Sequence, residues 1–221
     1  INPLVEIDPE NIFLSRSPRF RLQGEFIRDA ALSFSGLLVD SVGGPSVKPY
    51  QPANIWNEVS LNGGLRYKRD SGDKLYRRSI YTYWKRSAPM PNMLIFDAPT
   101  REKCMIQRPI TNTPLQALVV LNDPQFVEAA RAFAQKMITE AGNNEKDRIN
   151  YGFNVALSRE ATEEEISVIS QVLKSQMESF NADNEKAKQF LSVGEISRDE
   201  KIDLVEHASW TVIAQMLLNM D

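Results

Sequence analysis

The sequence of 221 residues holds one cysteine, Cys104, and one histidine, His207. A single thiol cannot close an intramolecular disulfide, and it cannot supply a C-x-x-C-H haem attachment or a cysteine-rich zinc site. Zinc, copper and iron sites depend on imidazole and thiolate ligands. We therefore predict no cofactor and no bound metal. Cys104 is expected to be a small buried residue, and His207 to be packed and hydrogen-bonded on an apolar helix.

Long apolar runs are also absent. No stretch approaches the roughly 18 apolar residues that a transmembrane helix needs, so no membrane span is expected. The sequence has no signal-peptide pattern and starts at Ile1 rather than Met. We interpret it as a piece of a longer protein. A Ser-His-Asp triad could use only His207, and no G-x-S-x-G elbow accompanies that histidine.

Charge of each sign is unevenly distributed along the chain. The net charge is −3, yet residues 66–108 hold eleven lysines and arginines against four acidic residues. Residues 140–221 hold sixteen acidic residues against eight basic ones. This asymmetry predicts either an interaction surface for an anion or pairing between the two regions. Nucleic acid is not a predicted partner, because the whole chain is acidic and carries no known binding motif.

Helix start signals are clear in the second half of the chain. "TPLQ" at 113–116 combines a threonine cap, a proline at the first helical position and a glutamine three residues on. "DPQF" at 123–126 begins a second helix, which is expected to end near Gly142. "TEEE" at 162–165 and "SRDE" at 197–200 are read as further capping boxes ahead of periodic apolar stretches.

The first half mixes helical and irregular patterns. A helix is predicted over about residues 18–39, whereas glycines and prolines interrupt residues 41–75. Turn residues at Asn62–Gly64 favour a minor hairpin. The stretch "YRRSIYTYWKR" at 76–86 fits a helix or a strand, and we favour the helix. The predicted fold is mainly α: one helical domain over the whole chain with a small irregular or β-hairpin insert, and a candidate internal boundary near 141–146.

Five motifs follow one another along the chain: "GEFIRDAAL", "GGPSVKPYQP", "YRRSIYTYWKRSAPMPNMLIFDAPTREKC", "TNTPLQALVVLNDPQFVEAARAFA" and "LLNMD". In this order, from about Arg16 to the last residue, the chain resembles the uncharacterised C-terminal domain of planctomycete-type cytochrome proteins. The resemblance implies an exported bacterial protein, periplasmic or on the cell surface, in which this domain follows upstream domains of the same polypeptide. It also implies a link to carbohydrate or sulfated-glycan breakdown, without an established activity or catalytic residues.

The predicted front helix carries a charged group, Arg21, Glu25, Arg28 and Asp29. Spacings of three and four residues would place Arg21, Glu25 and Arg28 on one helix face. These side chains could line a ligand-binding cleft, or they could form ordinary salt bridges on the helix surface, which is the commoner case. Arg28 and Asp29 are retained as candidate ligand-binding residues, and Glu25 as a candidate acid/base.

A second charged group lies in residues 76–86, where cations stand beside aromatic rings. Its candidate ligand-binding residues are Arg77, Arg78, Lys85, Arg86, Tyr83 and Trp84. Arginine forks bind carboxylates, sulfates and phosphates, and neighbouring aromatic rings can stack on sugars or guanidinium planes. On a helix, Arg78, Lys85 and Arg86 would lie roughly on one side. The alternative is that these cations pair with the acidic C-terminal half.

Asp97 is a weak candidate for a catalytic carboxylate. It lies two residues before Pro99 and could pair with Glu25 or Glu102 in acid/base catalysis. Alternatively, its side chain could stabilise a turn. Thr100 is expected to cap a short helix. Because no complete catalytic motif is present, the sequence favours a binding or docking module for an anionic glycan. A hydrolase or lyase site that uses Asp97 or Glu25 as the acid/base is the alternative.

Overall fold

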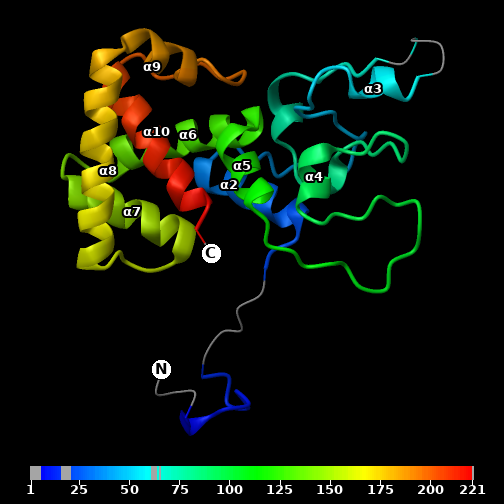
Figure 1. The fold of residues 1–221 in the computed structure, drawn as a ribbon, viewed down its shortest axis with the longest axis horizontal. Coiled ribbons are helices and arrows are strands. Elements are labelled where there is room, and N and C mark those ends of the chain that lie inside the picture. The colour runs from blue at the N-terminus through cyan, green and yellow to red at the C-terminus, as the bar shows by residue number, and fades with distance from the viewer. Residues whose placement is uncertain (1–5, 16–20, 61–63, 65, 221) are drawn as a thin grey trace.

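The computed structural model describes residues 6–15, 21–60, 64 and 66–220 of the chain. It is mainly α-helical, as predicted. Figure 1 shows a body of packed helices with a region of loops and short helices beside it. The helices are α2 (Gly24–Ser35), α3 (Ile55–Glu58), α4 (Pro91–Ile95), α5 (Pro114–Asn122), α6 (Pro124–Glu140), α7 (Glu145–Leu157), α8 (Glu163–Ala182), α9 (Asn184–Leu191) and α10 (Leu204–Leu218), with short 3-10 helices η1 (Gly72–Tyr76) and η2 (Ser79–Tyr81).

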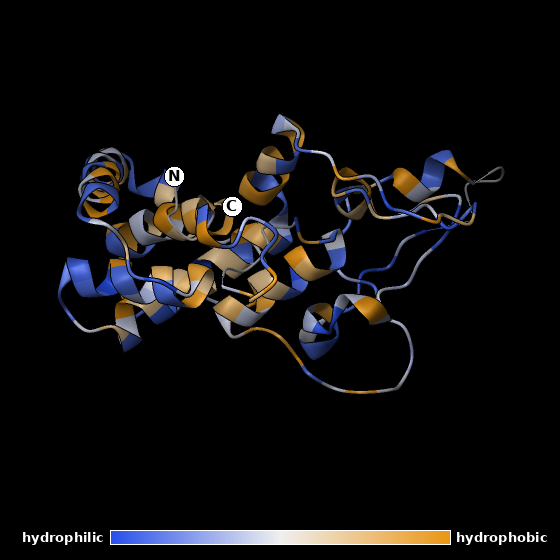
Figure 2. Ribbon diagram, turned by 90° about the horizontal axis from the view of Figure 1, so that it is seen from below, coloured by the Kyte–Doolittle hydropathy of each residue, from blue (hydrophilic) through white to orange (hydrophobic). Residues whose placement is uncertain are grey.

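The main hydrophobic core lies where α6 and α10 pack together, with α7 and α8 covering it. Phe133 and Met137 of α6 and Trp210 and Ile213 of α10 are at most 1% exposed. Burial of a side chain of this size contributes about 1.5–3 kcal/mol. Figure 2 shows hydrophobic and hydrophilic residues interspersed along the ribbons of the helical body. Among the described helices, none combines the length and the apolar character needed to cross a bilayer.

Three predicted helix starts are confirmed. The Thr113 and Thr162 capping boxes are formed, and the Asp123 side chain accepts a hydrogen bond from the Gln125 amide. The helix that starts at Pro124 ends at Glu140, close to the predicted end at Gly142. The local sequence therefore determines these helix ends.

The capping box predicted at "SRDE" is wrong. The last helix starts later, and its cap is Asp203, whose side chain accepts a hydrogen bond from the Glu206 amide at 2.9 Å. The stretch "DLVE" has the same three-residue spacing as "SRDE", so the sequence offered two starts. Ile202 is buried and its carbonyl accepts a hydrogen bond from Arg198, which holds the earlier stretch in a turn.

The capping box of α5 can be tested by a single substitution. Replacing Thr113 with Ala is expected to destabilise the fold by about 1 kcal/mol, because the box at the helix N-terminus loses its hydroxyl. Chemical denaturation of the variant should show a lower midpoint with an unchanged slope. A midpoint equal to that of the unsubstituted protein would show that the box does not stabilise the helix.

The described part of the region from Leu37 to Met90 is irregular apart from α3, η1 and η2, which agrees with the irregular form of the insert predicted over residues 41–75. The predicted helix over residues 76–86 is wrong, because this stretch forms only the three-residue 3-10 helix η2 and otherwise bonds to distant backbone. The Tyr76 carbonyl accepts from the Val39 amide at 3.0 Å, and Val47 exchanges hydrogen bonds with the stretch around Thr82. Within the described ranges these contacts form two isolated parallel bridges. The turn predicted at Asn62–Gly64 lies largely outside the described residues.

Three smaller predictions are also wrong. The front helix spans Gly24–Ser35 rather than residues 18–39, so Arg21 precedes it and cannot share its face. Cys104 is exposed on the long loop that follows α4. That loop contains no helix for Thr100 to cap, and Thr100 instead accepts a hydrogen bond from the Glu102 amide at 3.4 Å. The internal boundary near 141–146 stays a prediction.

Candidate functional site

Arg28 holds the irregular region against the helices. Its side chain is 1% exposed, and it donates to the carbonyls of Leu75 at 2.7 Å and Arg77 at 2.8 Å. Its Nε donates to Gln125 at 2.6 Å. Burial lowers the pKa of the Arg28 guanidinium to about 10, and the carboxylate of Asp29 opposes that shift. All these contacts are internal, so the arrangement assigns Arg28 a structural role.

Arg77 is likewise used inside the protein. It is 7% exposed, and its guanidinium donates to the carbonyls of Ser41, Gly43 and Pro45. The same guanidinium lies 3.9 Å from the ring centre of Tyr81. Gly43 has φ of 80°, a conformation that suits glycine and that turns its carbonyl toward this site. Arg77 therefore fastens the "GGP" turn.

The two candidate acid/base residues anchor the long loop after α4. Glu25 accepts from Arg108 at 2.7 Å, and Asp97 accepts from the amide and hydroxyl of Thr111 at 2.8 Å. Trp84 contributes to the same loop, because its indole N–H donates to the Thr100 carbonyl at 3.1 Å. These contacts explain why acidic and aromatic residues cluster here in the sequence.

The remaining candidates fall into separate places. Tyr83 and Lys85 join residues that the sequence pattern did not single out, and together they form what we call the aromatic–lysine cluster. Its members are Lys48, Trp56, Tyr67, Tyr83 and Lys85. The Trp56 ring centre is 5.4 Å from that of Tyr67 and 5.9 Å from that of Tyr83. The ammonium of Lys85 lies 4.4 Å from the centre of Trp56, and that of Lys48 lies 5.3 Å from the centre of Tyr83.

Backbone contacts bring this cluster together. The Tyr83 amide donates to the Val47 carbonyl at 2.7 Å, which places Lys48 beside the Tyr83 ring. The Tyr67 hydroxyl donates to the Pro49 carbonyl at 2.6 Å. Such pairings join residues 18 to 36 positions apart, so no local pattern in the sequence predicts them. The short helix α3 then presents Trp56, which is 8% exposed.

Three buried donors in or beside the cluster lack acceptors, as do polar atoms elsewhere in the described residues, such as His207 Nδ1 and Ser209 Oγ. Lys85 Nζ, Trp56 Nε1 and the amide nitrogen of Gln51 are buried, and none has a hydrogen-bond partner among the described residues. Buried polar groups are normally paired. The face of Trp56 satisfies part of the charge on Lys85, but it offers no acceptor for the three N–H bonds of the ammonium.

Arg78 and Asp29 line a different hollow, along the outer side of α2. It has a volume of about 420 Å³, and its apolar wall consists of Leu22, Phe26, Ala30, Phe34 and Leu38. Asp29 accepts hydrogen bonds from the amide and hydroxyl of Ser79, whereas Arg78 is exposed. Asp40 is the other charged residue of this lining. We call this hollow the α2 groove. Arg86 is exposed and lines neither the groove nor the cluster.

The basic and acidic regions meet at one ion pair among the described residues. Arg69 donates to Glu195 at 3.1 Å, and Glu195 also accepts from the Gly72 amide at 2.5 Å. Among the described residues no other ion pair joins residues 66–108 to residues 140–220, so general pairing between the two regions does not account for the charge asymmetry.

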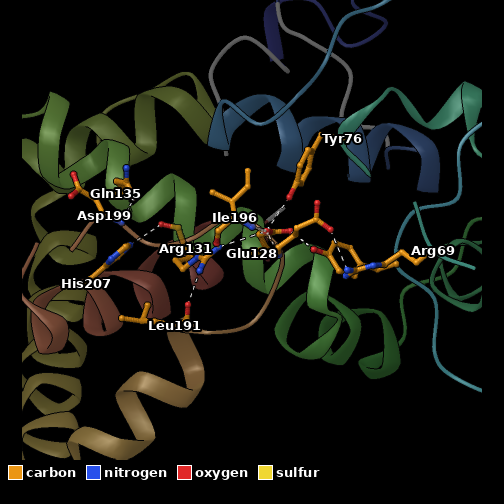
Figure 3. Close-up of polar contacts among 11 residues, drawn as sticks. Arg69, Tyr76, Glu128, Arg131, Gln135, Leu191, Ile196, Asp199 and His207 are labelled. Carbon is orange, nitrogen blue, oxygen red and sulfur yellow. Dashed lines mark hydrogen bonds and ion pairs between the residues drawn. The ribbon is translucent and has the colours of Figure 1, made fainter. Parts of the chain in front are cut away.

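A buried polar network in the helical body was not predicted from the sequence. Glu128 is 1% exposed and accepts from the hydroxyls of Tyr50 and Tyr76 and from the amides of Glu195 and Ile196 (Figure 3). Burial and the neighbouring Glu128 carboxylate raise the pKa of both tyrosine hydroxyls. The network joins α6 to the irregular region and to the loop before α10.

The network continues through Arg131 to His207. Arg131 lies 3.6 Å from Glu128 and donates to the carbonyls of Leu191 and Ile196. The Arg131 carbonyl in turn contacts His207 Nε2 at 3.1 Å. His207 is fully buried, and burial lowers its pKa. The prediction of a packed, hydrogen-bonded histidine is confirmed. In the described part of the chain, no group of three or more His, Cys, Asp or Glu side chains is arranged to hold a metal ion.

A comparison against protein families assigns the chain to one of them. The family model described as "PSD1: Protein of unknown function (DUF1553)" matches residues 2–173, which is more than half of the chain. The chain therefore belongs to this family, and the match is consistent with the resemblance found in the sequence. No curated protein matches the chain, and no solved structure matches it.

Proposed function

We propose that this domain is a non-catalytic binding module for an anionic sugar, carboxylated or sulfated, and that the aromatic–lysine cluster is its site. The observation that carries the proposal is the buried ammonium of Lys85, which has no hydrogen-bond partner among the described residues. Lys85 as a residue is half-buried, and the Trp56 ring compensates only part of the charge of its ammonium. An oxyanion brought by a ligand would supply the missing acceptor.

The aromatic rings of the cluster determine the second group that a ligand needs, which is a sugar ring. Tyr83 is 38% exposed, so part of its ring is available to an incoming molecule beside the Lys48 ammonium. Aromatic faces attract polarised C–H groups and cations, and a sugar ring presents C–H groups on its flat side. The indole N–H of Trp56 would hydrogen-bond to a hydroxyl or acidic oxygen of the same ligand. An anionic sugar combines the two groups that the cluster recognises.

Catalysis at Asp97 or Glu25 has less support. Both carboxylates accept hydrogen bonds from residues that anchor the loop after α4. A pair of glycosidase carboxylates needs a free proton-transfer position on each side of the bond that is cleaved. We therefore favour binding. The exported location and the upstream domains as partners belong to the same proposal, and they depend on the resemblance of the sequence motifs.

Binding can be tested by isothermal titration calorimetry with three soluble polymers: a polygalacturonate, a sulfated galactan and an uncharged glucan. We expect one or both anionic polymers to bind and the glucan not to bind. The variant Lys85→Met should weaken binding at least about tenfold, since a hydrogen bond to a charged group is worth about 1.5–3 kcal/mol. Raising the ionic strength should also weaken binding.

Stability separates a ligand-binding Lys85 from a structural one. Because Lys85→Met removes a buried unpaired ammonium, its melting temperature should equal or exceed that of the unsubstituted protein while binding is lost. The matched control is Lys174→Met, at an exposed position of α8, which should change neither property. Absence of binding to both anionic polymers, or unchanged binding by Lys85→Met, would contradict the proposal.

A further inference from the structure

The N-terminal segment, residues 6–15, is a compact turn with apolar side chains on its outside. Asp8 is 5% exposed, and its carboxylate accepts from the amides of Ile12 at 2.8 Å and Phe13 at 3.0 Å. Ile12, Phe13 and Leu14 are 70%, 82% and 82% exposed. Figure 1 shows this segment set apart from the helices. Three adjacent exposed apolar residues on an ordered turn are typical of a docking surface.

The α2 groove offers a matching apolar surface. Leu22 and Phe26, at one part of its wall, are 44% and 52% exposed. Phe34 and Leu38 continue the apolar lining, and the volume of about 420 Å³ accommodates one or two large side chains. The groove is therefore large enough for Phe13 together with Ile12 or Leu14.

The chain itself limits how far the turn can lie from the groove. Only residues 16–20 separate the segment from Arg21, and Leu22 already lines the groove. Six Cα–Cα steps from Ser15 to Arg21 reach at most about 20 Å. A tether this short gives an effective concentration on the order of millimolar, which favours an intramolecular contact over an equal external one.

The groove lining carries one cation, Arg78, and two carboxylates, Asp29 and Asp40, so charge offers an acidic segment a single attractive contact. Residues 6–15 contain three acidic residues and no basic one. In the groove, Arg78 is exposed and available, and Asp29 is occupied by Ser79. Asp40 is the groove charge that would oppose an acidic segment, so we place Glu10 toward Arg78 rather than toward Asp40.

We propose that residues 6–15 dock into the α2 groove of their own chain as a strap, with Phe13 as the anchoring side chain. The strap covers Phe26 and Arg78 when it is docked. The α2 groove is then an intramolecular receptor rather than a ligand pocket, and the aromatic–lysine cluster stays accessible. This inference is independent of the proposed sugar binding.

Disulfide trapping tests the strap in the whole chain. The exposed Cys104 is first replaced with Ser, and then Ile12→Cys is combined with Ser33→Cys on the groove wall. The matched control combines Ile12→Cys with Ser175→Cys, an exposed serine of α8. Under mild oxidation, we expect the groove pair to form an intramolecular disulfide at least about tenfold faster than the control pair. Intact mass and peptide mapping identify the product.

The anchor provides the second measurement. Adding Phe13→Asp to the groove pair should reduce its rate to that of the control pair, because a carboxylate cannot enter the apolar wall. Circular dichroism of each variant verifies that the helices are intact. Equal rates for the two pairs would overturn the proposal. Disulfide-linked dimers as the main product would also overturn it, because they would place the turn in the groove of a second copy.

Discussion

Replacing Glu128 with Ala should destabilise the protein by about 3–5 kcal/mol, the largest effect that we expect from a single substitution in this chain. The change leaves the Arg131 guanidinium buried without its carboxylate, and it leaves the amides of Glu195 and Ile196 without acceptors. Such groups lose their protein partners without gaining water. Urea denaturation monitored by tryptophan fluorescence measures the change in the free energy of unfolding. At the upper end of this range the variant would no longer fold.

The control is the exposed ion pair between Lys146 and Glu163, whose side chains are 50% and 82% exposed. Glu163→Ala should cost less than about 1 kcal/mol, because surface pairs contribute little. If Glu128→Ala and Glu163→Ala had similar effects, the buried network would not stabilise the fold. Gly194→Ala offers a second probe of the same place, since a Cβ there would collide with the Glu128 carboxylate.

Arg28→Met is expected to have the second-largest effect, about 3 kcal/mol. Methionine fills part of the same volume, but the carbonyls of Leu75 and Arg77 and the Gln125 side chain lose a buried donor. Each unsatisfied group costs about 1–3 kcal/mol, partly relieved by rearrangement. Arg28→Lys should restore little, because one ammonium cannot reach the positions of a planar guanidinium.

Arg86→Met serves as the comparison for Arg28→Met, because Arg86 is exposed and its removal should change the unfolding free energy by less than about 0.5 kcal/mol. Loss of near-ultraviolet circular dichroism with retained helical signal would locate the damage in the irregular region. If the Arg28→Met variant had an unchanged free energy of unfolding, Arg28 would be dispensable for docking the irregular region on α2.

Helix starts were predictable because their determinants lie within four residues of one another. Thr113 and Gln116, or Thr162 and Glu165, carry the whole instruction for a capping box. The stretch at 76–86 was mispredicted because its backbone groups bond to residues near 39 and 47. The number of competing long-range pairings is large, and the sequence alone gives no means of ranking them.

The candidate site was predicted only in part for the same reason. The pattern of arginines and aromatics identified Tyr83 and Lys85, but their neighbours Trp56 and Lys48 come from another stretch of the chain. Arginines that looked available, such as Arg28 and Arg77, are buried and bonded to carbonyls. Residue type predicts which contacts a side chain can make. Its burial decides whether it makes those contacts with a ligand or with the backbone.

The central position of α10 has a consequence for synthesis of the protein. The ribosome makes this helix after the other described helices, yet it fills the core against α6, and the loop just before it supplies the amides that bind Glu128. Until α10 leaves the ribosome, the apolar face of α6 lacks its main cover, and Tyr50 and Tyr76 have no complete network to join. We therefore expect the helical body to fold only after α10 has emerged, and the nascent chain to expose hydrophobic surface until then.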